Sequence, residues 1–282
     1  MWANYHTHSQ YCDGREKPET YLAEAQQQGL IALGFSSHAP LPFARPWCMA
    51  SDSFAGYITH MATLKENADI EIACGLEVDF IPGLIGPHHF QHQLDYTIGS
   101  VHFVDRLPDG DHWEIDSTRE TFERGLREIF ANDTKEAISR YFELIREMVN
   151  QSPPDVVGHL DKIKMHNKGD RFFQESDRWY RDQVDLTLQA VKRQGCILEV
   201  NTRGWYLGKT DSLYPSPWVA QRALEMQIPI CLSSDAHRPD ELTKGFDDAA
   251  AELFRLGCRK TKIWLGGQWQ FISFSPDGLR IR

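Results

Sequence analysis

The chain has 282 residues, of which 41% are apolar and 25% are charged, a composition typical of a globular protein. Its net charge of −10 argues against non-specific binding to nucleic acid or to an anionic membrane, because both surfaces would repel it. A negatively charged chain can still bind an anionic substrate where bound cations reverse the local field.

The sequence contains no signal-like N-terminal segment and no stretch of about 18 apolar residues, so we expect a cytoplasmic protein. The six cysteines stand singly, without a CxxC pair, and three of them lie inside apolar runs. We therefore expect free thiols rather than a disulfide framework.

In chain order, short apolar runs alternate with helical segments. A helix is expected to begin at Pro18 and to end at Gly29, because proline favours the first helical turn and glycine commonly follows the last. Strands are expected near residues 2–6, 31–35, 70–76, 95–101, 155–158, 196–200, 228–233 and 262–265. Two further helices are predicted from apolar residues at three- and four-residue steps: Ile138, Tyr141, Ile145 and Met148, then Tyr180, Val184, Leu188 and Val191.

Repeated strand–helix–strand units favour parallel pairing in an α/β fold, closed or nearly closed into a barrel. No low-complexity linker interrupts the pattern, so we expect a single domain over residues 1–282. Irregular segments rich in proline and glycine are expected at residues 39–54, 79–93 and 103–117. Each follows a strand that ends in a candidate ligand, so these loops are predicted to lie over the active site.

Histidines and carboxylates recur directly after the predicted strands. In the pairs His6/His8 and Asp235/His237, alternation by two places both side chains on one face of an extended segment. In a parallel barrel, the carboxyl ends of the strands meet at one rim, where such ligands converge. The candidate metal ligands are His6, His8, Asp13, His38, Glu77, His102, His159, Asp235 and His237.

Imidazole and carboxylate ligands without thiolate favour zinc, manganese or iron. Nine ligands exceed the needs of one ion, so we expect two to three divalent ions, with Glu77 as a bridge between two of them. Glu77, Asp235 and His237 are also the expected catalytic residues. Any one of these histidines alone could be an ordinary core or loop residue, which is the interpretation we adopt for His60, His88, His89, His92, His112 and His166.

Motifs along the chain occur in the order of a known family. They occupy residues 6–8, 11–14, 34–43, 75–83, 98–103, 158–161, 199–204, 214–217 and 233–237. From residue 4 to about residue 265, the sequence resembles the PHP (polymerase and histidinol phosphatase) superfamily. Within it, the sequence is most similar to the monofunctional histidinol-phosphate phosphatases.

The resemblance implies a distorted seven-stranded (β/α) TIM-like barrel of the PHP type with three metal ions. It assigns one ion to His6, His8, Glu77 and Asp235, a second to Glu77, His102 and His159, and a third to Asp13, His38 and His237. Asp13 departs from the pattern, since many members have a histidine there. The implied reaction is hydrolysis of L-histidinol phosphate, a small-molecule ester, to L-histidinol and inorganic phosphate.

Phosphate monoesters hydrolyse extremely slowly in water, so the enzyme must lower a high barrier. Two cations roughly 3.5–4 Å apart can activate a bridging water for in-line attack and neutralise the charge that develops. For the remaining phosphate oxygens, Arg203 is the first candidate cation and Lys162 the second, with Arg15 and Lys164 weaker. Candidate contacts for the amine and imidazole of the substrate, unranked by the sequence, are Phe43, Trp47, Asp79, Glu114 and Asp161.

Three alternatives remain at this point. A related metal-dependent phosphoesterase could act on another small phosphate monoester or a nucleotide through the same ligands. A non-catalytic barrel, of the kind fused to polymerases, would be expected to have lost ligands. A sugar-cleaving or deaminating metal barrel would have a different ligand order. The sequence leaves the metal identity and the oligomeric state open.

Overall fold

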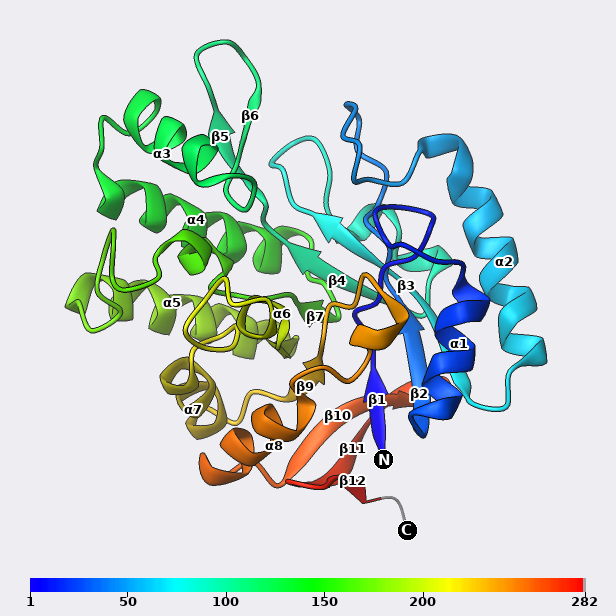
Figure 1. The fold of residues 1–282 in the computed structure, drawn as a ribbon. Helices are drawn as coiled ribbons and strands as arrows, with labels where there is room; N and C mark the ends of the chain where they lie inside the picture. Colours follow the sequence, from blue (N-terminus) through cyan, green and yellow to red (C-terminus); the bar gives the residue numbers. More distant parts are fainter. Residues whose placement is uncertain (281–282) are drawn as a thin grey trace.

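The computed structural model describes residues 1–280, and it contains a nearly closed barrel of seven parallel strands (Figure 1). Residues just beyond the first and last of these strands join the two edges, because His8 N donates to Ala236 O at 2.8 Å and Ala236 N to His6 O at 3.0 Å. The expected barrel is thus confirmed. Its strands, in order around the barrel, are β1 (Trp2–Asn4), β2 (Leu30–Phe35), β3 (Glu71–Asp79), β4 (Tyr96–Ser100), β7 (Val156–Val157), β8 (Ile197–Asn201) and β9 (Ile230–Ser233).

Helices cover the outside of the barrel (Figure 1). As predicted, Pro18 begins the first of them and the two apolar stripes are buried, on α4 and α5. The α-helices are α1 (Pro18–Gln27), α2 (Phe54–Asn67), α3 (Arg119–Glu128), α4 (Thr134–Gln151), α5 (Arg178–Gln194), α6 (Arg203–Tyr206), α7 (Pro217–Glu225) and α8 (Phe246–Arg255). Short 3₁₀ helices occupy Ser51–Ser53, Pro87–His89, Gln91–Gln93, Lys162–His166 and Pro239–Glu241.

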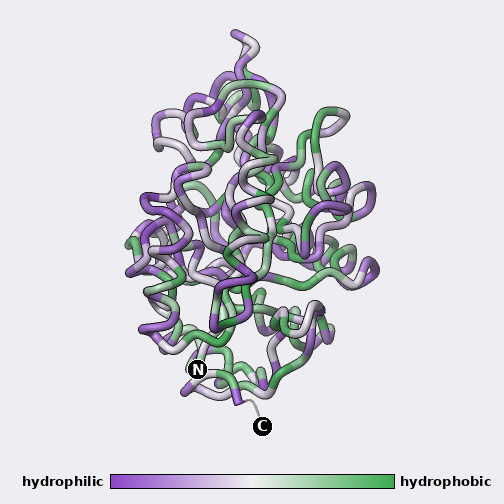
Figure 2. The backbone as a smooth tube through the Cα atoms, turned by 90° about the vertical axis from the view of Figure 1, so that its right-hand side faces the viewer, coloured by the Kyte–Doolittle hydropathy of each residue, from purple (hydrophilic) through white to green (hydrophobic). Residues whose placement is uncertain are grey.

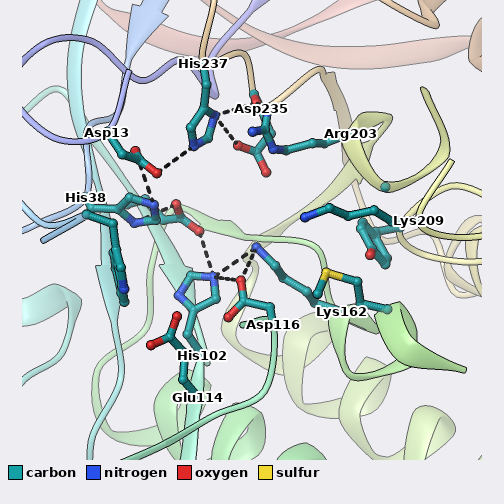
Figure 3. Close-up of a pocket in the computed structure, with 15 residues that line it drawn as sticks. Asp13, His38, His102, Glu114, Asp116, Lys162, Arg203, Lys209, Asp235 and His237 are labelled. Atoms are coloured by element: carbon teal, nitrogen blue, oxygen red, sulfur yellow. Dashed lines mark hydrogen bonds and ion pairs between the residues drawn. The ribbon is translucent and has the colours of Figure 1, made fainter. Parts of the chain in front are cut away.

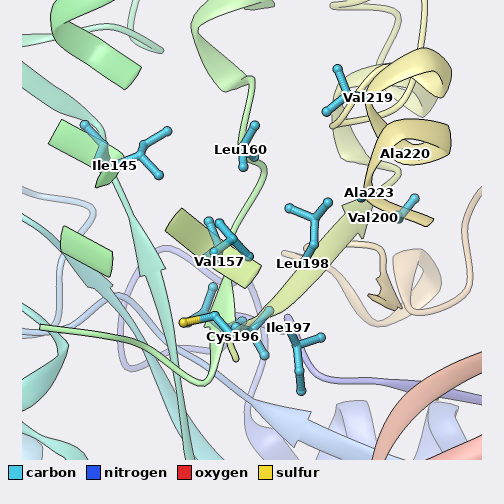
Figure 4. Close-up of a cluster of buried hydrophobic side chains, with 14 of the residues drawn as sticks. Ile145, Val157, Leu160, Cys196, Ile197, Leu198, Val200, Val219, Ala220 and Ala223 are labelled. Atoms are coloured by element: carbon cyan, nitrogen blue, oxygen red, sulfur yellow. The ribbon is translucent and has the colours of Figure 1, made fainter. Parts of the chain in front are cut away.

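The layer between strands and helices is apolar. Figure 4 shows side chains from this layer, among them Ile145 of α4, Val200 of β8 and Val219 of α7, which belong to one buried cluster. These side chains are buried, and their removal from water holds the helices on the barrel. None of the described helices is both long and apolar enough to cross a membrane.

The predicted strand at residues 262–265 exists but does not join the barrel. It is β10 (Lys260–Leu265), which forms an antiparallel sheet with β11 (Gln268–Ser275) and β12 (Gly278–Arg280). Gly266 and Gly267, with φ of 62° and 74°, form the tight turn that sends β11 back along β10. Leu279 N donates to Met1 O at 2.9 Å, so this sheet lies at the end of the barrel where the chain starts (Figures 1 and 2).

Two of the three long loops agree with their predicted place at the carboxyl end of the barrel. Loop 103–117 was predicted to be irregular, but it contains a hairpin of β5 (Phe103–Arg106) and β6 (His112–Glu114). Loop 39–54 contacts this hairpin, because the rings of Phe43 and His112 stack at 4.3 Å.

The prediction for loop 79–93 is wrong for most of its length. His88 N donates to Ser152 Oγ at 2.9 Å, which places this part of the loop at the end of α4, before β7 begins. The loop runs from the carboxyl end of β3 back to the start of β4, as a connection between parallel strands must.

Candidate metal centre

All nine candidate ligands lie together at the carboxyl end of the barrel strands. His6 and His8 follow β1, His38 follows β2, and Glu77 lies in the last part of β3. Seven of the nine residues are buried, and only Asp13 and His237 are partly exposed. The remaining ligands follow β1, β4, β7 and β9: Asp13, His102, His159, Asp235 and His237.

Glu77 lies at the middle of the cluster. Its Oε2 atom is 3.1 Å from His6 Nε2, 3.1 Å from His38 Nδ1 and 3.5 Å from His8 Nε2. Because three imidazoles face one oxygen, Glu77 has the position of a bridging ligand.

The second carboxylate oxygen of Glu77 faces a different set of side chains. Its Oε1 atom is 2.8 Å from His159 Nε2 and 3.6 Å from His102 Nε2, and it accepts a hydrogen bond from Ser100 Oγ at 2.6 Å. The two oxygens therefore connect both halves of the cluster.

Asp235 closes the cluster from β9. Its Oδ1 atom is 3.2 Å from His8 Nε2 and 3.4 Å from His237 Nδ1. Asp235 adopts a left-handed backbone with φ of 52°, a region that residues other than glycine rarely adopt and that occurs often at functional sites.

Asp13, the ligand at which the sequence departs from the family pattern, lies among histidines. Its Oδ2 atom is 3.2 Å from His237 Nε2, and its Oδ1 atom is 3.7 Å from His8 Nδ1 and 3.9 Å from His38 Nε2. The ligand atoms of these four residues all lie within 4.8 Å of one another.

The grouping of ligand atoms differs in part from the one that the resemblance implies. The group of His6, Glu77 and His159 is distinct from that of His38, Glu77 and His102. His102 and His159, expected on one ion, thus have different histidine neighbours around Glu77. A further group consists of His6, His8 and Asp235, which are three of the four residues that the resemblance assigns to one ion; Glu77 is the fourth.

The donor atoms fit divalent cations. His6 Nε2, His8 Nε2, His38 Nδ1 and Asp13 Oδ1 are buried and make no hydrogen bond, although oxygen or nitrogen atoms lie 3–4 Å away. Bonds of about 2.0–2.1 Å to one tetrahedral zinc ion would hold neighbouring ligand atoms about 3.3 Å apart. Buried nitrogen and oxygen atoms that face one another without hydrogen bonds are typical of a coordination site.

Two carboxylates outside the ligand set orient the histidines. His6 Nδ1 lies 2.5 Å from Glu199 Oε1, and His102 Nδ1 lies 3.0 Å from Asp79 Oδ1. Such carboxylates hold the ring and its tautomer in the orientation that a metal requires. Glu199 has no role among the expectations from the sequence, and Asp79 appears there only as a possible substrate contact. A carboxylate inside an apolar barrel strand was the signal that could have identified Glu199.

The electrostatic environment shifts the pKa values of His8 and His102 in opposite directions. Burial and the neighbouring His237 lower the pKa of His8 to about 4, so its imidazole is neutral at pH 7, as a metal ligand must be. Burial also disfavours the charged form of His102, but Asp79 and Asp116 outweigh it and raise the pKa to about 9. His102 would therefore release a proton when it binds a cation.

A pocket opens directly onto the cluster, and Arg203 and Lys162 line it, whereas Arg15 is exposed and outside it (Figure 3). Arg203 Nη1 donates to Asp235 O at 2.8 Å, and Lys162 Nζ lies 2.9 Å from Asp116 Oδ2. The remaining pocket residues include Trp47, Glu114, Asp116, Lys209 and Tyr214.

The structure also shows which of the candidate substrate contacts line the pocket. Asp161 and Lys164 pair with each other at 2.9 Å, away from this pocket, and Phe43 does not line it. Asp116 and Lys209 line the pocket and were not identified from the sequence, since neither follows a barrel strand directly.

Comparison with known proteins agrees with this architecture. The PHP domain family matches residues 4–203, which is more than half of the chain. The chain belongs to the PHP family. This PHP protein is 29% identical over 265 residues to a probable histidinol-phosphatase of Deinococcus radiodurans, covering 90% of this chain and 93% of the relative. It is 28% identical over 268 residues to the histidinol-phosphatase of Bacillus subtilis, covering 86% and 96% of the two chains.

Two solved structures share the fold of this PHP protein. HisK of Listeria monocytogenes has a TM-score of 0.76 and 21% identity, covering 87% of this chain and 99% of that chain. Histidinol phosphate phosphatase of Lactococcus lactis, solved with zinc, L-histidinol and phosphate, has a TM-score of 0.65 and 20% identity, covering 99% of both chains. Both structures support the distorted seven-stranded barrel.

Proposed function

We propose that this PHP protein is a metal-dependent phosphatase that hydrolyses L-histidinol phosphate to L-histidinol and inorganic phosphate. The Bacillus subtilis relative is named histidinol-phosphatase and the Deinococcus radiodurans relative probable histidinol-phosphatase. Both align with this chain over most of their length. The cluster at the barrel rim and the pocket beside it supply groups suited to this reaction. We also propose that residues 1–282 form one domain, since two buried apolar clusters, one from Ala3 to Leu279 and one from Tyr21 to Leu242, draw on overlapping stretches of the chain.

The nine clustered residues would hold two or three divalent ions, of zinc, manganese or iron. Zinc is present in the structure of the Lactococcus lactis enzyme. When bound, the ions would supply a hydroxide for attack on phosphorus and neutralise the charge that develops. Glu77 would act as the shared carboxylate, and Asp235 and His237 would act beside it, because all three residues line the pocket.

Arg203 and Lys162 would bind the phosphate oxygens that face away from the ligands. The hydrogen bonds that Arg203 donates within residues 1–280 use its backbone N and Nη1, which leaves the other edge of the guanidinium for two oxygens. Burial disfavours the charged form of Lys162, yet Asp116 raises its pKa, so both side chains are cationic at pH 7.

The observation that carries the choice of substrate is the acidic wall of Glu114 and Asp116, in which Asp116 pairs with Lys162 and Glu114 does not. Glu114 lines the pocket beside Trp47, and burial together with the nearby Asp116 raises the pKa of Glu114. A carboxylate in this environment favours a substrate that brings a positive charge. Histidinol phosphate has a phosphate at one end and an ammonium and an imidazole at the other.

The alternative is another small phosphate monoester or a nucleotide. An ester with additional phosphates would face Glu114 and Asp116, which repel it. A neutral ester would bring no positive charge to Glu114, whose charged neighbour within residues 1–280 is Arg45, with Nε at 3.8 Å. We therefore favour the ester that carries an amine.

The test measures phosphate release by the purified protein before chelation, after chelation and after add-back of zinc, manganese or iron. We expect hydrolysis of histidinol phosphate to depend on metal and to exceed that of p-nitrophenyl phosphate and a nucleoside monophosphate. Metal-dependent release from the other esters, with none from histidinol phosphate, would favour the alternative. No metal-dependent release from any ester would contradict the assignment as a phosphatase.

A further inference from the structure

Lys209 is a pocket cation that has no role in the function described above. It follows α6, the short helix that begins with Arg203, and it lines the same pocket as Arg203 and Lys162. Figure 3 shows its side chain extended into the pocket from the loop after α6.

The backbone around Lys209 is held in place. The amides of Lys209 and Thr210 both donate to Gly204 O, at 2.8 and 3.1 Å. A Cβ at position 204 would lie 2.4 Å from the ring of Tyr214, so only glycine allows this close approach. The loop therefore folds back onto the start of α6, which brings Lys209 to the same pocket as Arg203.

Lys209 differs from the other two cations in its partners. Lys162 Nζ lies 2.9 Å from Asp116, and Arg203 Nη1 lies 3.4 Å from Glu241. Within residues 1–280, the Nζ atom of Lys209 makes no hydrogen bond and no ion pair, although it lines the pocket. An unpaired ammonium beside two paired cations is available to an anionic ligand.

The electrostatics of Lys209 agree with three cations meeting in one place. Although Lys209 is exposed, partial desolvation and repulsion by Lys162 and Arg203 lower its pKa. A dianionic phosphate between the three side chains would relieve this repulsion, because opposite charge favours the ammonium form.

We propose that Lys209 binds a non-bridging oxygen of the phosphate group in the substrate, and in the same way binds the product, inorganic phosphate. This inference rests on the proposed phosphatase function and adds a third phosphate-binding residue to Arg203 and Lys162. Lys162 and Arg203 already pair with carboxylates of the protein, so Lys209 is the residue of the three whose charge only the phosphate would neutralise.

The experiment titrates inorganic phosphate into the metal-loaded protein by calorimetry, with metal content measured for each variant. Lys209→Gln should weaken phosphate binding about tenfold, as expected for loss of one charge-assisted hydrogen bond at a partly exposed site. Lys209→Arg should restore most of the affinity. Lys192→Gln, an exposed lysine in the last turn of α5, is the matched control and should bind phosphate as the parent does.

Steady-state kinetics provide a second measurement. Lys209→Gln should raise KM about tenfold and change kcat by less than about threefold, as for a group that binds ground state and transition state alike. Unchanged phosphate affinity in Lys209→Gln at full metal content overturns the proposal, and so does a loss of metal in that variant. Since the phosphate titration does not depend on the ester, a protein inactive on histidinol phosphate would refute the proposed function and leave this test intact.

Discussion

The carboxylate of Glu199 lies 2.5 Å from Nδ1 of His6, across the ring from the Nε2 atom that faces Glu77. Burial disfavours an ionised Glu199, but the neighbouring His6 outweighs it and lowers the pKa of the carboxyl. With a cation bound at Nε2, the ionised carboxylate would hold the proton on Nδ1 and so fix the tautomer of the ring. In the proposed metal centre, Glu199 would therefore orient His6 as a ligand without lying in the pocket.

We therefore expect Glu199→Gln to weaken metal binding by about 10- to 100-fold, because the ring loses the partner that sets its tautomer. Competition with a chelator measures this affinity. The matched control is Asp155→Asn, which changes a largely buried carboxylate that binds Thr97 N at 2.8 Å outside the cluster. If both variants lost metal equally, the effect would be one of general destabilisation.

Glu77→Ala and His102→Ala are each expected to abolish turnover, by a factor of at least about 10³, while the protein remains folded. The carboxylate of Glu77 faces five histidines, so its loss would remove a ligand from each group of candidate metal ligands that contains it. Activity assays with circular dichroism check both points. His88→Ala, in a loop that contacts Ser152, should be fully active. Normal activity of Glu77→Ala would contradict the bridging role.

Arg203→Ala should raise KM and weaken inhibition by phosphate about tenfold, with much less effect on metal content. Its guanidinium would bind phosphate, although Nη1 also holds Asp235 O, so Arg203→Lys should recover only part of the function. Arg15→Ala is the control, because Arg15 is exposed outside the pocket. This substitution should change neither KM nor inhibition by phosphate. Unaltered phosphate inhibition in Arg203→Ala would refute the assignment.

Glu114→Gln tests the acidic wall. KM for histidinol phosphate should rise about tenfold, because the substrate's cation loses its partner, whereas hydrolysis of p-nitrophenyl phosphate should not change. Asp105→Asn, an exposed acid on β5, is the control. An equal effect on both esters would mean that Glu114 acts on the metal centre and not on the amine.

Removal of the metal should lower the melting temperature by roughly 5–10 °C when the ion was present at about 100 times its Kd. Without cations, the buried lone pairs of His6, His8 and His38 have no partner. Scanning calorimetry before and after chelation checks this shift. Glu77→Ala should show a smaller shift, and an equal shift would indicate that the ions bind elsewhere.

The sequence by itself predicted the barrel strands and all nine clustered residues. Both depend on local patterns: an apolar run specifies a buried strand, and a polar residue at its end must face the rim. His6 and His8 were paired by their spacing alone, and the structure places both beside Asp235.

Tertiary structure decided what depends on packing between distant segments. β10 reads as a barrel strand, but the barrel already closes between β1 and β9, so β10 pairs with β11 instead. Glu199, Asp116 and Lys209 acquire their places only because the folded chain brings them to His6, Lys162 and Arg203. Spacing along a strand is a property of the chain, whereas the partner of a buried charge is a property of the fold.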